Sequence, residues 1–91
     1  MANVHVELPG LLADILGVQR LDVDAKTLRG ALEALVARCP ALGTHLFDEH
    51  GQLREHVLCF HNETNTRWLK GEDVAVREGD RILIMQAVSG G

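Results

Sequence analysis

The segment TLRGALEALVARCP, residues 27–40, sets the architecture of this chain. Its apolar residues recur at the spacing of one helical face, which is formed by Leu28, Ala31, Leu32, Leu35 and Val36. Thr27 suits the N-cap, Arg38 suits the last turn, and Pro40 prevents the helix from continuing. We therefore predict an amphipathic helix between Thr27 and Pro40.

Strands are predicted before this helix. Apolar Val4, Val6 and Leu8 alternate with polar residues, which is the period of a half-buried strand, and Pro9-Gly10 ends it. Residues 20–24 alternate again and predict a second strand, antiparallel to the first. The segment between the two strands, residues 11–17, suits a short helical turn closed by glycine.

The segment directly after the helix is mixed. Residues 40–47 predict a short turn of helix, anchored by Leu42, Leu46 and Phe47, and residues 48–51 predict a loop. The continuous apolar run from Val57 to Phe60, within residues 56–61, is typical of a central strand covered on both faces.

The last third of the chain predicts further strands. Residues 62–65 have the composition of a turn, and a weak short strand is expected around residues 66–69. A second turn is expected at residues 78–80, followed by a final strand over residues 81–87. Two strands, a helix and more strands indicate an α+β domain with the helix across one face of a sheet. We expect residues 1–87 to form this domain and residues 88–91 to form a flexible tail.

Composition excludes several classes of protein. The net charge is −4 and no basic stripe is present, which argues against a nucleic-acid or anionic-membrane surface. No signal peptide or membrane span is expected, so the sequence predicts a soluble, cytoplasmic protein. Cys39 and Cys59 are then expected to be thiols rather than a disulfide.

Conventional active-site motifs are missing from the sequence. There is no glycine-rich phosphate loop, no H-E-x-x-H motif and no nucleophile elbow, so an enzyme is not expected. The histidines and cysteines match no compact zinc spacing, and no metal site is predicted. Cys39 follows a helix C-terminus, where nothing evident makes its thiol reactive.

The sequence ends in Val88-Ser89-Gly90-Gly91. Because glycine has no Cβ, the last two residues can enter a narrow tunnel in a partner, and four extended residues reach roughly 13 Å. A carboxylate there becomes reactive once adenylation by ATP gives it a good leaving group. The chain has no ATP-binding motif, so a partner would supply that step. A frayed end is the structural alternative.

The final strand is apolar on both faces. Ile82 and Ile84 are expected to point one way, and Leu83 and Met85 the other. One interpretation is a central strand covered on both faces. The other is an exposed apolar patch beside the tail, which would dock a partner.

These residues together carry a family resemblance. The segments are Phe60-His61-Asn62-Glu63, Gly71, Glu78-Gly79-Asp80-Arg81-Ile82-Leu83-Ile84 and Ala87-Val88-Ser89-Gly90-Gly91. They resemble the molybdopterin synthase small subunits and thiamine sulfur carriers (the MoaD/ThiS type), over nearly the whole chain. The resemblance implies a ubiquitin-like β-grasp fold, with a mixed sheet of four to five strands and one main helix.

The resemblance also implies a function. A ubiquitin-activating-like adenylyltransferase, using its own ATP, would adenylate Gly91, which is then converted to a thiocarboxylate. That group would donate sulfur to a biosynthetic enzyme for a cofactor, cysteine or a thio-metabolite, with Val88, Ser89 and Gly90 threading into the partner. Leu83 and Met85 fall where the family keeps its partner-facing apolar residues. The alternatives are a protein modifier conjugated through Gly91 and a non-reactive β-grasp interaction module.

Overall fold

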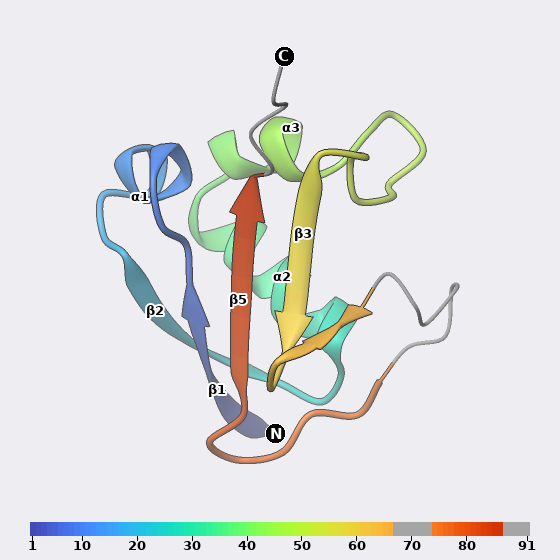
Figure 1. Cartoon of the computed structure of the whole chain (residues 1–91). Coiled ribbons are helices and arrows are strands. Elements are labelled where there is room, and N and C mark those ends of the chain that lie inside the picture. Colours follow the sequence, from blue (N-terminus) through green and yellow to red (C-terminus); the bar gives the residue numbers. More distant parts are fainter. Residues whose placement is uncertain (67–73, 87–91) are drawn as a thin grey trace.

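A computed structural model of the chain describes residues 1–66 and 74–86. In this part, strands and helices follow in the order β1 (Ala2–Glu7), α1 (Leu11–Leu16), β2 (Arg20–Ala25), α2 (Leu28–Arg38), α3 (Ala41–Leu46), β3 (Val57–His61), β4 (Thr64–Asn65) and β5 (Arg81–Gln86). Each element that was predicted from residues 1–61 is present, and the final strand begins at the predicted residue (Figure 1).

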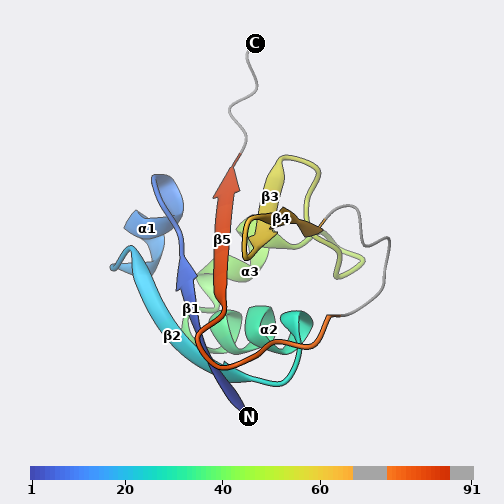
Figure 2. The ribbon, with the colours of Figure 1, turned by 60° about the horizontal axis from the view of Figure 1, so that its bottom comes forward.

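The strands form one mixed sheet in the order β2-β1-β5-β3-β4. β1 pairs antiparallel with β2 and parallel with β5, while β3 is antiparallel to both β4 and β5. Helix α2 lies across one face of this sheet, as the two views of the ribbon show (Figures 1 and 2). The predicted α+β architecture is therefore confirmed, and β5 occupies the centre of the sheet.

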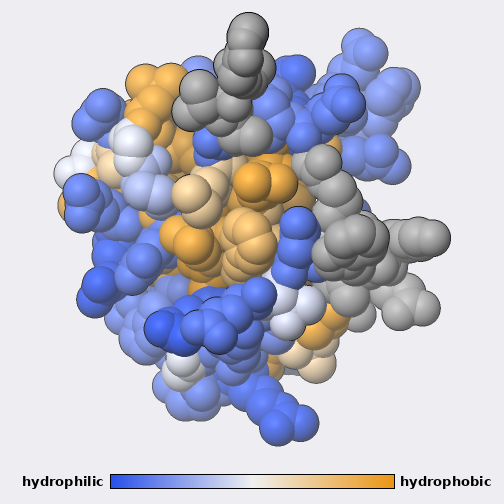
Figure 3. All heavy atoms as spheres, viewed as in Figure 1, coloured by the Kyte–Doolittle hydropathy of each residue, from blue (hydrophilic) through white to orange (hydrophobic). Residues whose placement is uncertain are grey.

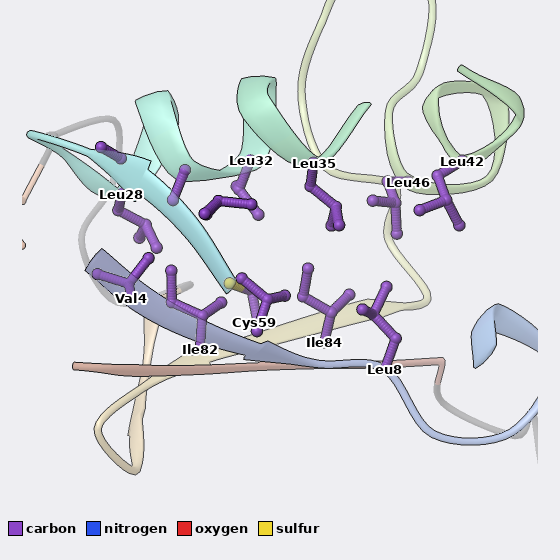
Figure 4. Close-up of a cluster of buried hydrophobic side chains, with 14 of the residues drawn as sticks. Val4, Leu8, Leu28, Leu32, Leu35, Leu42, Leu46, Cys59, Ile82 and Ile84 are labelled. Atoms are coloured by element: carbon purple, nitrogen blue, oxygen red, sulfur yellow. The ribbon is translucent and has the colours of Figure 1, made fainter. Parts of the chain in front are cut away.

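Helix α2 begins and ends where its sequence predicts. The Thr27 hydroxyl accepts a hydrogen bond of 3.0 Å from the Gly30 amide, which satisfies one of the free donors of the first turn. The apolar face is buried at Leu28, Ala31, Leu32 and Leu35, whereas Val36 at its margin is half-buried. Figure 4 shows this face pointing onto β5 and β3.

The core lies between α2 and the inner face of the sheet. Alternate strand residues supply it, and the buried ones are Val4, Val6, Val57, Cys59, Ile82 and Ile84. Figure 4 shows Val4, Cys59, Ile82 and Ile84 on the face of the sheet that the helices cover. Leu42 and Leu46 of α3 close one end of this layer. Successive side chains of a strand point to opposite faces. The residues of β5 and β3 that lie between these buried positions therefore point to the outer face of the sheet.

Two predictions for the β3 region were wrong in detail. The turn after β3 is limited to Asn62 and Glu63, because both have positive φ and Thr64–Asn65 already pairs with β3. The short strand thus precedes the predicted residues 66–69, of which 67–69 lie outside the described residues. β3 is also not fully buried on both faces, since its outer residues Leu58 and Phe60 are only half-buried.

Candidate functional site

The outer face of β5 carries the residues predicted to dock a partner. Leu83 lies opposite Glu7 of β1 and Phe60 of β3, and Met85 lies opposite Leu58 of β3. Residues that pair across neighbouring strands share a face, so these side chains project together from the outer face. We name the four apolar residues Leu58, Phe60, Leu83 and Met85 the outer patch.

Exposure separates the two faces of β5. Met85 is 36% exposed and Leu83 is half-buried, whereas Ile82 and Ile84 are almost completely buried. Figure 3 shows hydrophobic surface at the middle of the outer face, with hydrophilic residues around much of it. The predicted alternation along β5 is therefore confirmed. Its use in docking stays a prediction.

The outer patch forms part of a shallow groove. The groove has a volume of about 410 Å³ and is lined by His5, Glu7, Phe60, Glu63, Arg81, Ile82, Leu83 and Met85. Its floor is apolar, while its ionisable side chains come from β1, from the start of β5 and from the turn after β3. An apolar floor with a few polar groups at the rim is the usual composition of a recognition surface.

The charged residues around the groove form exposed pairs. The Arg20 guanidinium lies 3.0 Å from the Glu7 carboxylate, and that of Arg81 lies 3.8 Å from Glu63. These pairs are solvent-exposed, so each contributes little to stability. Their carboxylates thus keep acceptor capacity for a partner.

Asp80 organises the turns at one end of β5. One carboxylate oxygen accepts hydrogen bonds from the Arg77 amide and from the His61 ring, each at 2.8 Å. The other accepts from the Asn62 side-chain amide at 3.0 Å. Asn62 in turn accepts from the Arg81 amide at 2.8 Å. The β3–β4 turn and the turn before β5 are thereby fixed to one another.

This arrangement lowers the pKa of the Asp80 carboxyl from 3.8 to about 2. The side-chain hydrogen bond from Asn62 is the largest cause, followed by those from the Arg77 amide and His61. Each donor stabilises the ionised carboxylate more than the neutral acid. Asp80 is therefore ionised at neutral pH and accepts hydrogen bonds from His61, Asn62 and Arg77. Its role is to hold these residues in position.

The predicted reactive tail lies outside the described residues. β5 ends at Gln86, and the structure does not describe Ala87, Val88, Ser89, Gly90 and Gly91. The same holds for Gly71, which contributed to the family resemblance. The structure describes the strand that precedes the tail in the sequence and the outer patch on that strand.

Cys39 and Cys59 are both free thiols, as predicted. Burial raises the pKa of Cys59, so this thiol stays protonated and unreactive in the core. Within residues 1–66 and 74–86, no three His, Cys, Asp or Glu residues gather closely enough to bind a metal ion. None of the helices in that part is long and apolar enough to cross a membrane.

Three candidate residues were missed by the sequence analysis. Leu58 and Phe60 join the outer patch because β3 pairs antiparallel with β5, a pairing that the alternation of residues 81–86 alone does not reveal. Glu63 lines the groove because a two-residue turn places it there. The adjacent Asn62 was the available signal, because asparagine adopts positive φ readily.

Comparison with known proteins places the chain among characterised relatives. It is 36% identical over 87 residues to small archaeal modifier protein 1 of Haloferax volcanii, covering 88% of this chain and 91% of that protein. It is 29% identical over 92 residues to the sulfur carrier protein CysO of Mycobacterium tuberculosis, covering 98% and 99% of the two chains.

Solved structures agree with the observed topology. The crystal structure of the Haloferax volcanii modifier protein superposes with a TM-score of 0.87 at 29% identity, covering 99% of this chain and all of that one. The expected ubiquitin-like β-grasp fold is thereby confirmed. The sequence model of the ThiS family matches residues 6–91. With its mixed sheet, central β5 and near full-length relatives, the chain belongs to the ThiS family of ubiquitin-like proteins.

Proposed function

We propose that this protein is a sulfur carrier whose working group is the carboxylate of Gly91. The observation that carries the proposal is the outer patch of β5 and β3, because β5 is the last described strand before Val88-Ser89-Gly90-Gly91 in the sequence. A family member named as a sulfur carrier, aligned over nearly the whole length of both chains, supports it. In this proposal residues 1–87 are the docking domain and residues 88–91 are the tail.

The chemistry proceeds in two steps on a partner enzyme. A carboxylate oxygen of Gly91 attacks the α-phosphorus of ATP, and pyrophosphate leaves. Hydrosulfide then attacks the acyl carbon and AMP leaves, which gives a thiocarboxylate. This chain supplies the acyl group, while a ubiquitin-activating-like adenylyltransferase binds ATP. The thiocarboxylate then passes its sulfur to a sulfur-accepting biosynthetic enzyme, and the carrier itself binds no cofactor.

The described residues suit a folded domain that docks on the partner enzyme and presents the tail to it. Leu83 and Met85 offer a partner an apolar surface, and Met85 can repack against more than one partner. One residue, Ala87, separates the end of β5 from the tail, and the four tail residues reach roughly 13 Å when extended. A partner bound at the outer patch can therefore receive Gly91 in an active site close by.

The test is mass spectrometry after incubation with ATP, sulfide and the activating enzyme of the same organism. Trypsin cleaves after Arg81, so the peptide Ile82–Gly91 reports on the terminus and contains no cysteine. Exchange of oxygen for sulfur resembles oxidation of Met85 in mass, so the fragment is alkylated and sequenced. Sulfur on Gly91 is expected. A Gly91-deleted chain is the control, and an unmodified terminus beside a second carrier that is modified would overturn the proposal.

A second function has its own support. The relative at 36% identity is named a modifier protein, so conjugation through Gly91 to lysines of other proteins is the alternative product. Isopeptide-linked species of higher mass would identify it, whereas a free thiocarboxylate identifies the carrier. A non-reactive interaction module predicts that deletion of Gly91 leaves partner binding intact and that the terminus stays unmodified.

A further inference from the structure

In the turn after β3, Glu63 adopts a positive φ angle, which is unfavourable for a residue with a Cβ atom. Asn62 and Glu63 have φ angles of 49° and 77°. Asparagine tolerates this left-handed region, whereas the Cβ of glutamate meets the neighbouring carbonyl there. Two-residue hairpin turns with positive φ at both positions prefer glycine at the second. Because strained residues concentrate at functional sites, Glu63 calls for a functional explanation.

The turn is held rigidly against β5. The Asn62 amide donates to the Arg81 carbonyl at 2.9 Å, and the Arg81 amide donates back to the Asn62 side chain at 2.8 Å. Asp80 binds the Asn62 side-chain amide at 3.0 Å. These bonds fix the backbone of Glu63 relative to the strand that carries the outer patch.

Glu63 is consequently presented at the rim of the groove. It lines the groove with Phe60, Leu83 and Met85, and its side chain is 87% exposed. Its described ion pair, with Arg81, is long at 3.8 Å and open to solvent, so that contact leaves the carboxylate able to bind another cation. Glu7 lines the same groove, but its carboxylate already pairs with the Arg20 guanidinium at 3.0 Å.

We propose that Glu63 is a specificity-determining residue that selects a partner with an arginine or lysine beside its docking side chain. The partner's apolar side chain would rest on the outer patch, and its cation would meet Glu63. Of the two groove carboxylates, Glu63 has the longer ion pair, at 3.8 Å against 3.0 Å for Glu7, so Glu63 is the one more open to such a cation. The inference rests on the proposed function, and we take the partner to be the activating enzyme.

The experiment compares two glutamates whose side chains are equally exposed but lie at different places on the surface. Glu63→Gln removes the charge with little change of shape, and Glu63→Lys reverses it. Glu49→Gln is the matched control, because the Glu49 side chain is also 87% exposed and also makes one long ion pair, 3.7 Å to His50. Binding to the purified activating enzyme is measured by titration calorimetry without ATP, at low and at high salt, with the intact chain.

The result expected is a rise in Kd of roughly three- to tenfold for Glu63→Gln and a larger rise for Glu63→Lys. Both differences should shrink at high salt, and Glu49→Gln should bind like the parent. Equal binding by Glu63→Gln and Glu49→Gln would overturn the inference, even where Gly91 is thiocarboxylated. So would failure of the parent chain to bind, or a self-associating parent whose dimer requires Glu63.

The two proposals can fail separately. Weakened binding by the Glu63 variants together with an unmodified Gly91 would support the inference while overturning the carrier function. A thiocarboxylate on Gly91 with equal binding by the two glutamine variants would do the reverse.

Discussion

His61 and Asp80 form a hydrogen bond of 2.8 Å between Nε2 and Oδ2, and their side chains are only 16% and 14% exposed. The bond joins the end of β3 to the residue just before β5. Because a carboxylate can only accept, the His61 ring donates through Nε2. The pair belongs to the cluster that holds the β3–β4 turn and the groove rim in place.

Asp80→Asn should lower the free energy of unfolding by roughly 1–3 kcal/mol near pH 7. The reason is that the largely buried His61 ring would lose the charged acceptor of its hydrogen bond. The pKa of Asp80 falls from 3.8 to about 2 on folding, so its contribution is complete above pH 3.8. The contribution is lost as the pH falls toward 2. The gap between parent and variant should therefore close across this window in urea titrations.

The control for this measurement is Asp14→Asn on α1, an exposed carboxylate far from the cluster in sequence. It should change stability by less than about 0.5 kcal/mol at pH 7. A gap between parent and Asp80→Asn that is constant from pH 7 to pH 2 would contradict the assigned role of the Asp80 charge.

Glu63→Gly should stabilise the fold by about 0.5–1 kcal/mol, because glycine removes the Cβ contact at a φ of 77°. Thermal and urea unfolding measure the gain. Glu49→Gly is the control and should give none, since Glu49 is not among the described residues with positive φ. A loss of stability in Glu63→Gly would mean that its side chain contributes more to the fold than its backbone strain removes.

Ile84 and Met85 are sequence neighbours with opposite roles. Ile84→Ala should cost about 2–5 kcal/mol of unfolding free energy, because the side chain is fully buried between the sheet and α2. Met85→Asp should leave unfolding nearly unchanged and weaken binding to the activating enzyme, since Met85 faces outward. Unfolding of Met85→Asp under conditions where the parent is folded would show that Met85 belongs to the core.

Thr27→Ala should cost about 1 kcal/mol, because the Gly30 amide loses its capping acceptor. Thr27→Ser keeps the hydroxyl and should retain most of that stability. Urea unfolding of the two variants separates the cap from other effects of the substitution. Equal losses in both would indicate that the Thr27 methyl group, rather than its hydroxyl, carries the effect.

Cys59 should resist thiol reagents until the protein unfolds, since burial both hides it and raises its pKa. Cys39 is partly exposed and should react first. Peptide mapping after alkylation in buffer and in urea measures the two rates. Labelling of Cys59 in the native protein at the rate of Cys39 would reveal opening of the core between β3 and α2.

Local patterns predicted most of the fold because local physics determines it. The spacing of apolar residues from Leu28 to Leu35 fixes α2, and alternation fixes β1, β2 and β5. The turn at Asn62–Glu63 was extended too far because a two-residue hairpin usually shows glycine, and none is present here. The Asp80 cluster could not be predicted, since its side-chain bonds to His61 and Asn62 span 19 and 18 residues.

Two of the four residues of the outer patch were predicted from the sequence. Leu83 and Met85 follow from the alternation of one strand, but Leu58 and Phe60 depend on which strand lies beside it. The reactive tail stays a prediction, because residues 87–91 lie outside the described part of the chain.

The parallel pairing of β1 with β5 has a consequence for biosynthesis. β5 occupies the middle of the sheet, yet it is the last of the described strands in the sequence and is therefore synthesised last. Until residues 81–86 insert between β1 and β3, the sheet lacks its centre and the apolar face of α2 stays partly uncovered. An incomplete chain that ends before residue 81 therefore lacks both the complete sheet and the outer patch.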